Sequence, residues 1–194
     1  MNSGKSDTLI KAAYNYTERG LEVVTIKPSV DTKGQQSIVA RGGASRIVDI
    51  LASPTTDIRQ VVKDFEKSIA PKKLSCVLID ESQFLSEAQI DQLLDIAKID
   101  NISVIAYGLR ADFRRELFPG SKRLFELADN IEKLPTMCRC GSQAEFNTRK
   151  VGDHYVFDGE QVAIDGEEAV TYDSLCANCY RQEQEQAAKR KTQQ

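Results

Sequence analysis

Apolar and polar positions along the first 135 residues change repeatedly between helical spacing and short continuous apolar runs. Helical spacing predicts helices over residues 6–19, 55–69, 86–97 and 121–128. Short runs of apolar or β-branched residues predict strands over residues 21–26, 74–79, 102–106 and 130–134. Because helices and buried strands alternate, we expect an α/β fold with a mostly parallel sheet covered by helices on both faces.

Three segments lie outside this alternation. Residues 31–46 are rich in Gly, Gln, Ser and Lys and have no period, so we expect a surface loop there. After Pro135 the chain carries cysteines, scattered glycines and short alternating runs, which predict a small β subdomain over residues 136–180. The tail over residues 181–194 is almost entirely Gln, Glu, Lys, Arg and Ala and predicts a solvated helix or a frayed end. We therefore expect a main domain over residues 1–135 followed by these two parts.

Composition limits the partners of the chain. The net charge is −3 and the sequence pI is about 5.4, a balance that does not favour binding to nucleic acid or to an anionic membrane. The longest apolar stretches fall far short of the roughly 20 residues that cross a bilayer, so we expect no membrane span. The N-terminal residues do not resemble a secretory signal, and we expect a cytoplasmic protein that binds small anionic ligands locally.

A phosphate-binding motif opens the chain. Gly4, Lys5 and Ser6 match the end of the pattern G-x-x-x-x-G-K-[ST], in which amides and the lysine hold phosphates and the hydroxyl binds Mg²⁺. The helix predicted after it would point its N-terminus at the phosphates. We assign Ser3 and these three residues to ATP and Mg²⁺ binding; the alternative is that Ser3 only caps a helix and Lys5 is solvated. The first glycine of the motif would precede Met1, so we expect the full protein to extend upstream by about ten residues.

A pair of carboxylates follows the apolar strand predicted over residues 74–79. Asp80 and Glu81 would lie at the carboxyl edge of the sheet, where open α/β sheets bind their ligands. Successive strand residues face opposite ways, so the two side chains need not share a task. Asp80 can hold Mg²⁺, whereas Glu81 can take the proton of a substrate hydroxyl. The alternative is that both are ordinary charges at a strand end.

Four of the five cysteines form two close pairs. Cys138 and Cys140 make the first pair, Cys176 and Cys179 make the second, and thirty-five residues separate them. Such a set can supply four thiolates to a tetrahedral Zn²⁺, which would be structural because no coordination position is left for a reacting water. The alternative is four reduced cysteines without a metal. The fifth cysteine, Cys76, lies within a predicted strand and is expected in the core.

Several segments together carry a resemblance to a known family. They are residues 1–6 (M-N-S-G-K-S), 79–85 (I-D-E-S-Q-F-L), 107–114 (Y-G-L-R-A-D-F-R) and the two cysteine pairs. In this order they resemble the type II thymidine kinases, and the resemblance covers nearly the whole chain. It implies a RecA-like P-loop fold with a zinc-binding lasso subdomain. It also implies transfer of the γ-phosphoryl group of ATP to the 5′-hydroxyl of thymidine, with deoxyuridine as another acceptor.

The resemblance further implies roles for single residues. Glu81 would be the base that activates the 5′-hydroxyl, and Asp80 would assist the metal. Side chains that would contact the thymine are Met1, Phe84, Leu109, Phe113 and, from the lasso, Tyr172. Backbone groups of about residues 162–172 would read the base edge, and the family suggests a homotetramer. The alternative for Phe84, Leu109 and Phe113 is plain core packing.

Two other functions fit the same motifs. One is a zinc-stabilised nucleotide-binding module with impaired catalysis, which the absence of an upstream strand would explain. The other is a P-loop ATPase that uses water as the phosphoryl acceptor. Phosphoryl transfer that depends on a nucleoside would distinguish the kinase from both.

Overall fold

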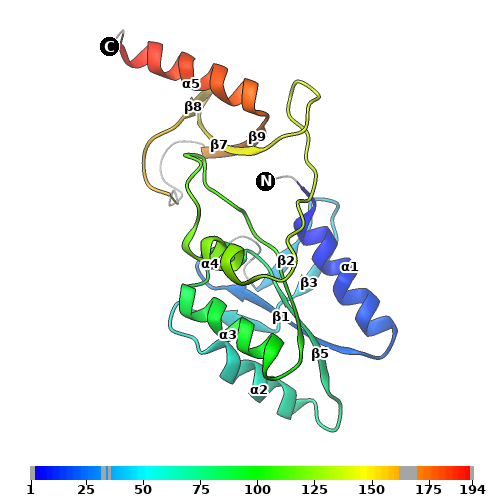
Figure 1. Cartoon of the computed structure of the whole chain (residues 1–194). Coiled ribbons are helices and arrows are strands. Elements are labelled where there is room, and N and C mark those ends of the chain that lie inside the picture. Colours follow the sequence, from blue (N-terminus) through cyan, green and yellow to red (C-terminus); the bar gives the residue numbers. More distant parts are fainter. Residues whose placement is uncertain (1–2, 32–33, 35, 162–169, 193–194) are drawn as a thin grey trace. The chain divides into compact units, whose positions relative to one another are not determined.

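The structure is a computed structural model that describes residues 3–31, 34, 36–161 and 170–192 (Figure 1). The chain divides into two compact units. The first, named here the sheet unit, holds Gly4–Leu109 and Phe118–Ile131. The second, the cysteine unit, holds Ser3, Arg110–Leu117 and the described residues from Glu132 onward. No helix in these described stretches is long and apolar enough to cross a lipid bilayer.

A four-stranded parallel sheet with the strand order β4-β1-β5-β6 forms the centre of the sheet unit. Its strands are β1 (Glu22–Pro28), β4 (Ile50–Ala52), β5 (Leu74–Ile79) and β6 (Ser103–Ala106). The prediction of a parallel sheet is confirmed, and β1, β5 and β6 lie where the sequence predicts strands. The sequence does not predict β4, because three residues are too few to show a period.

Helices cover both faces of this sheet, as the sequence predicts (Figure 1). They are α1 (Lys5–Glu18), α2 (Ile58–Ser68), α3 (Glu87–Lys98) and α4 (Pro119–Leu127), with a 3₁₀ turn η1 (Ser82–Phe84). Alternate side chains of β5 point to the two faces. Cys76 and Leu78 pack with α1, whereas Val77 and Ile79 pack with α2 and α3. All four are 0% exposed, so the core position expected for Cys76 is confirmed.

The start of α3 is fixed by a capping box. Gln89 N donates to Ser86 Oγ (3.3 Å), and Ser86 N donates to Gln89 Oε1 (3.1 Å). The Gln89 side-chain amide also donates to the carbonyl oxygens of Ser53 and Thr56, at 2.9 and 3.0 Å. These bonds tie α3 to the loop before α2. The prediction that Ser86 caps this helix is confirmed.

Residues 31–46 contain more structure than the expected loop. β2 (Ser37–Val39) pairs with β3 (Ser45–Ile47) in an antiparallel hairpin. Ile38 is 1% exposed and packs in the same core as α1, so the hairpin extends the cover of that face. Strands of three residues with one buried side chain show no alternation in the sequence, which is why the pattern predicted a loop.

The strand predicted over residues 130–134 is wrong. This segment pairs with no strand among the described residues, and Ile131 is 58% exposed. It follows α4 and leads the chain out of the sheet unit. Its apolar residues therefore belong to a linker, where they have no sheet on which to pack.

The cysteine unit contains a three-stranded antiparallel sheet with the order β8-β7-β9. Its elements are β7 (Phe146–Val151), β8 (His154–Val156), β9 (Val170–Leu175) and the helix α5 (Ala177–Thr192). A small core that includes Leu175 and Tyr180 joins α5 to the sheet. The short alternating runs after Pro135 correspond to this sheet. Of the two structures considered for the tail, the helix is found, as the continuation of α5.

The segment Arg110–Leu117 also belongs to the cysteine unit, which the sequence does not indicate. Two hydrogen bonds of 2.7 Å link it to the rest of the unit: Tyr180 Oη donates to the carbonyl oxygen of Phe113, and Asn147 Nδ2 donates to that of Ala111. The chain enters the unit a second time at Glu132, close to the boundary expected at residue 135. Besides Ser3, two stretches separated by α4 therefore build the described part of this unit.

Removing the cap of α3 should destabilise the sheet unit. Ser86→Ala deletes the hydroxyl that accepts a hydrogen bond from the Gln89 backbone N–H. We expect the free energy of unfolding in urea to fall by about 1 kcal/mol. Ser29→Ala, at an exposed side chain, serves as the control and should change it by less than about 0.5 kcal/mol. A Ser86→Ala protein as stable as the wild type would contradict the role given to the capping box.

Candidate active site and metal centre

The N-terminus of α1 has the geometry of a helix end that can bind an anion. Gly4 precedes the helix with φ 72° and ψ 19°, a left-handed conformation that residues with a side chain rarely adopt. The first hydrogen bond of the helix runs from Thr8 N to Gly4 O (2.9 Å). The amides of Lys5 and Ser6 precede this bond, so they point out of the helix end, where they can bind an anion.

The Asp80 carboxylate is buried at the end of β5. Its backbone N donates to Ile26 O in β1 (3.0 Å), and the residue is 4% exposed. The pKa of this carboxyl is raised to about 6, chiefly by burial and then by the charges of Glu81 and Asp31, while a backbone hydrogen bond from Glu81 and the charge of Lys5 act in the opposite direction. Oδ1 is buried and has no hydrogen-bond partner among the described residues. A buried carboxylate oxygen without a partner, close enough to Lys5 to feel its charge, fits a site for Mg²⁺ beside a phosphate.

Glu81 occupies a strained position in the turn after β5. It has φ 48° and ψ 40°, left-handed values that cost a residue other than glycine about 1–3 kcal/mol. The side chain is half-buried, and its Oε2 accepts a hydrogen bond from Gln83 Nε2 at 2.6 Å. Strain of this kind persists only where the surroundings hold the backbone. The turn therefore directs a carboxylate to a fixed place beside Asp80.

Two glycines allow the turn to pack closely against its neighbours. A Cβ atom built on Gly108 would lie 2.6 Å from Ser82 Oγ and 3.0 Å from Gln83 Oε1. One built on Gly120 would lie 2.6 Å from the carbonyl oxygen of Leu85. Ser82 N also donates to the carbonyl oxygen of Tyr107 (2.9 Å), which ties the turn to the residue after β6. The turn that carries Glu81 thus lies between the end of β6 and the start of α4.

Phe84 and Leu109, two of the residues expected to contact thymine, are both half-buried in the sheet unit. The Phe84 ring packs edge-on against Phe118, with ring centroids 5.7 Å apart. The Leu109 backbone is held on both sides: its amide donates to Gln83 Oε1 (2.9 Å), and its carbonyl accepts from Ser121 Oγ (2.6 Å). Packing within the unit therefore covers part of each residue and leaves the rest exposed.

Phe113 and Tyr172, also expected at the thymine, lie in the cysteine unit and both contact Arg149. The guanidinium carbon of Arg149 is 3.9 Å from the Phe113 ring centroid and 5.6 Å from that of Tyr172. Arg149 is only 5% exposed, and within the described part of the chain its Nε has no hydrogen-bond partner. Phe113, at 2% exposed, has the burial of a core residue. Sequence reasoning missed Arg149, because a single arginine in a short strand matches no motif.

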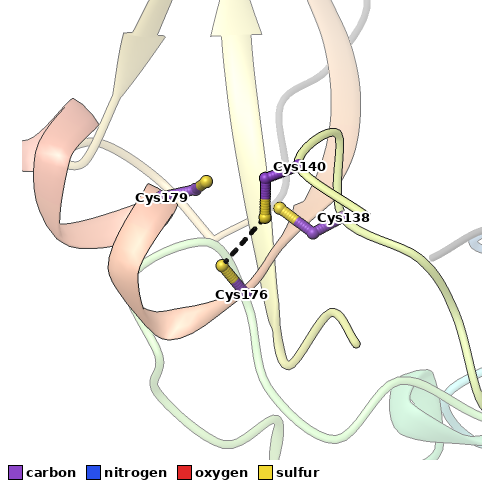
Figure 2. A group of neighbouring side chains, drawn as sticks. All are labelled: Cys138, Cys140, Cys176 and Cys179. Carbon is purple, nitrogen blue, oxygen red and sulfur yellow. Dashed lines mark hydrogen bonds between the residues drawn. The ribbon is translucent and has the colours of Figure 1, made fainter. Parts of the chain in front are cut away.

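The four paired cysteines lie together, as the sequence predicts (Figure 2). Cys138 and Cys140 come from a tight turn, and Cys176 and Cys179 come from the start of α5. All four Sγ atoms lie within 4.8 Å of one another, and those of Cys140 and Cys176 are 3.7 Å apart. Four thiolates at about 2.3 Å from a zinc ion would be about 3.8 Å apart, so the cluster fits a tetrahedral site.

Hydrogen bonds already favour a thiolate at one of these cysteines. The Ser142 side chain, followed by its backbone and the neighbouring sulfurs, lowers the pKa of the Cys140 thiol to about 6. Hydrogen bonds with Cys138 and Cys140 act in the opposite direction on Cys179 and raise its pKa to about 12. Four sulfurs this close cannot all be charged without a cation, which agrees with a metal-binding role.

Two of the residues assigned from the sequence remain to be placed. Ser3 is described and half-buried in the cysteine unit. Met1 lies outside the described residues, as do residues 162–169 of the segment expected to read the base edge. Gln83 was not assigned a role, although it stands inside the quoted motif of residues 79–85.

Comparison with known proteins agrees with this geometry. A sequence model described as thymidine kinase matches residues 1–180. The thymidine kinase of Mannheimia succiniciproducens is 40% identical over 185 residues, which cover 94% of this chain and 91% of the relative. Those of Legionella pneumophila strain Lens and Enterobacteria phage T4 are 43% and 39% identical, over 93% and 91% of this chain and 85% and 89% of the relatives. Over almost its whole length, therefore, this chain belongs to the thymidine kinase family.

Proposed function

We propose that this protein transfers the γ-phosphoryl group of ATP to the 5′-hydroxyl of thymidine, with deoxyuridine as a second acceptor. The proposal rests on the family and on one structural observation. One Asp80 oxygen is buried at the end of β5 and has no hydrogen-bond partner in the described part of the chain, and the charge of Lys5 at the N-terminus of α1 acts on it. A magnesium ion together with a triphosphate would satisfy both groups. Positioning and charge neutralisation of this kind are the main requirements of phosphoryl transfer.

In the proposed reaction the chain holds the phosphates and moves one proton. Lys5 and the amides at the start of α1 would bind the triphosphate. Ser6 and Asp80 would hold Mg²⁺, which would supply positive charge to offset the negative charge of the phosphates. Glu81 accepts the proton of the 5′-hydroxyl as the oxygen of that group attacks the γ-phosphorus. The bond between the γ-phosphorus and the bridging oxygen breaks, and ADP leaves with the bonding electrons.

The contacts to the nucleoside stay predictions. They are assigned by resemblance to Met1, Phe84, Leu109, Phe113 and Tyr172. Apolar side chains of this kind suit a thymine ring, with a few polar groups to fix its orientation. The homotetramer and the cytoplasmic location expected from the sequence also stay predictions.

We further propose that the cysteine cluster holds a structural Zn²⁺. Cys138, Cys140, Cys176 and Cys179 would complete the tetrahedron and leave no position for a reacting water. The metal would then join the start of α5 to the turn that follows residue 137, closing the chain between the two pairs into a loop. Such a link adds stability to a unit with a small apolar core.

Replacing the proposed base should slow the chemical step without abolishing binding. We expect Glu81→Gln to lower turnover by about 10²- to 10⁴-fold, while thymidine affinity measured by calorimetry changes little. Labelled ATP with a panel of nucleosides provides the assay, and Glu18→Gln, at an exposed glutamate of α1, is the matched control. Wild-type turnover in Glu81→Gln would exclude the base, and phosphate release that ignores nucleosides would indicate an ATPase.

Neutralising Asp80 should stabilise the metal-free protein at neutral pH. The pKa of Asp80 is about 6 in the folded protein and 3.8 ordinarily. The free energy of unfolding therefore falls as the pH rises from 3.8 to about 6. Asp80→Asn removes this loss, so in EDTA we expect it to be about 1–3 kcal/mol more stable than the wild type at pH 7.5. The difference should vanish below pH 4.

The measurement is urea unfolding across this pH range, with Asp153→Asn, at an exposed aspartate, as the control. Equal stability of the wild type and Asp80→Asn at pH 7.5 would contradict a costly buried charge. We also expect Asp80→Asn to lose most Mg²⁺-dependent kinase activity. Stabilisation together with inactivity would separate a ligand role from a folding role.

Removing one cysteine of the cluster should remove the metal. We expect the purified wild type to contain about one zinc per chain by elemental analysis, and Cys140→Ser to contain almost none. Loss of the metal should lower the free energy of unfolding by at least about 2 kcal/mol, because the binding free energy is coupled to folding. Cys76→Ala, at the buried cysteine of β5, should keep the full zinc content. A wild-type protein free of zinc would exclude the proposed zinc site.

A further inference from the structure

Gln83 connects the proposed base to the polypeptide that follows β6. It lies in η1 and is 1% exposed. Its Nε2 donates to Glu81 Oε2 at 2.6 Å, and its Oε1 accepts from Leu109 N at 2.9 Å. One buried side-chain amide therefore bridges a carboxylate and a backbone amide that are 28 residues apart in the sequence.

The contact with Leu109 determines which way the Gln83 side-chain amide faces. A backbone N–H can only donate, so the oxygen of Gln83 must face Leu109. The NH₂ group then faces Glu81, and an ionised carboxylate is an acceptor only. The short distance of 2.6 Å agrees with a hydrogen bond strengthened by that charge. The contact thus favours one position of the Glu81 carboxylate.

The surroundings leave the Gln83 side chain little room to move. A Cβ atom on Gly108 would approach Oε1 to 3.0 Å and the Gln83 backbone N to 3.2 Å. A Cβ atom on Gly120 would approach the Gln83 carbonyl oxygen to 3.0 Å. Gly108 therefore packs against the Gln83 side chain and Gly120 against its backbone, and both contacts restrict the movement of the residue.

We propose that Gln83 is a positioning residue that holds the Glu81 carboxylate in the orientation in which it accepts the substrate proton. The inference rests on the proposed function of Glu81 as the base. Gln83 acts through Glu81 and does not itself contact the reacting atoms. The second hydrogen bond, from Leu109 N, fixes the Gln83 amide to the backbone that follows β6. The Glu81 carboxylate is therefore bound to a side chain that is itself held in place.

A double-mutant cycle tests this role. Gln83→Met has a similar length and removes both hydrogen bonds; we expect kcat to fall about 10- to 100-fold, with the KM values for ATP and thymidine within about threefold of the wild type. In the Glu81→Gln background the same change should lower kcat by less than about twofold, because the group being positioned is already gone. An equal loss of kcat in both backgrounds would overturn the inference and leave the base assignment intact. Unchanged turnover in Glu81→Gln alone would instead overturn the base assignment and the inference together.

A second variant separates the two hydrogen bonds of Gln83. Gln83→Glu keeps an acceptor for Leu109 N but loses the donor to Glu81 when ionised. We expect it to lose as much kcat as Gln83→Met at pH 8, and near wild-type kcat would show that the Leu109 bond alone matters. This variant also keeps the test decisive if Gln83→Met fails to fold.

Gln89 provides a matched control. It is also a buried glutamine, 3% exposed, and its amide donates to the carbonyl oxygens of Ser53 and Thr56. Gln89→Met should lower the free energy of unfolding but leave kcat within about twofold of the wild type. If Gln89→Met lowers kcat as much as Gln83→Met, general loss of stability explains the effect and positioning is excluded.

Discussion

The site depends on the carboxylate of Asp80, which is buried at the end of β5. β5 buries Val77 and Ile79 on one face and Cys76 and Leu78 on the other, so the last four residues of the strand expose no polar side chain. Asp80 continues this strand and inherits its low exposure, and one of its oxygens stays without a partner among the described residues. The packing of the core supplies the free energy that keeps this charge out of water. Because the buried carboxylate is shielded from water, a bound cation would compensate its charge better than solvent does.

A second constraint acts on the next residue. The left-handed backbone of Glu81 would relax if the following turn were free to move, but Gly108 and Gly120 let two other backbone segments approach it within contact distance. Local strain at one residue is thus offset by packing that involves β6, α4 and η1. The carboxylates, the glutamine and the turn form one arrangement, and none of them has its position without the others.

The sequence predicts the parts of this protein that have a period or a motif. Long helices and buried strands were predicted correctly because each carries several apolar residues in register. The family was also predicted correctly, because several motifs occur in the same order along the chain and together are more specific than any one of them. The short strands β2, β3 and β4 were missed because three residues have no period. The strand over residues 130–134 is wrong because its two apolar residues, Ile131 and Leu134, do not by themselves provide a partner strand. The contact of Gln83 with Leu109 and the burial of Arg149 depend on how distant segments meet, which local patterns do not encode.

Within the cysteine unit, one helix links the metal site to a segment that the sequence places far from it. Cys179 belongs to the cluster, and the next residue, Tyr180, packs against Phe146 and Phe157 with ring centroids 5.3 and 5.1 Å away. The Tyr180 hydroxyl donates to the carbonyl oxygen of Phe113, which belongs to the stretch Arg110–Leu117. The cysteines that fix the start of α5 therefore also fix Tyr180, and through it the backbone of Phe113.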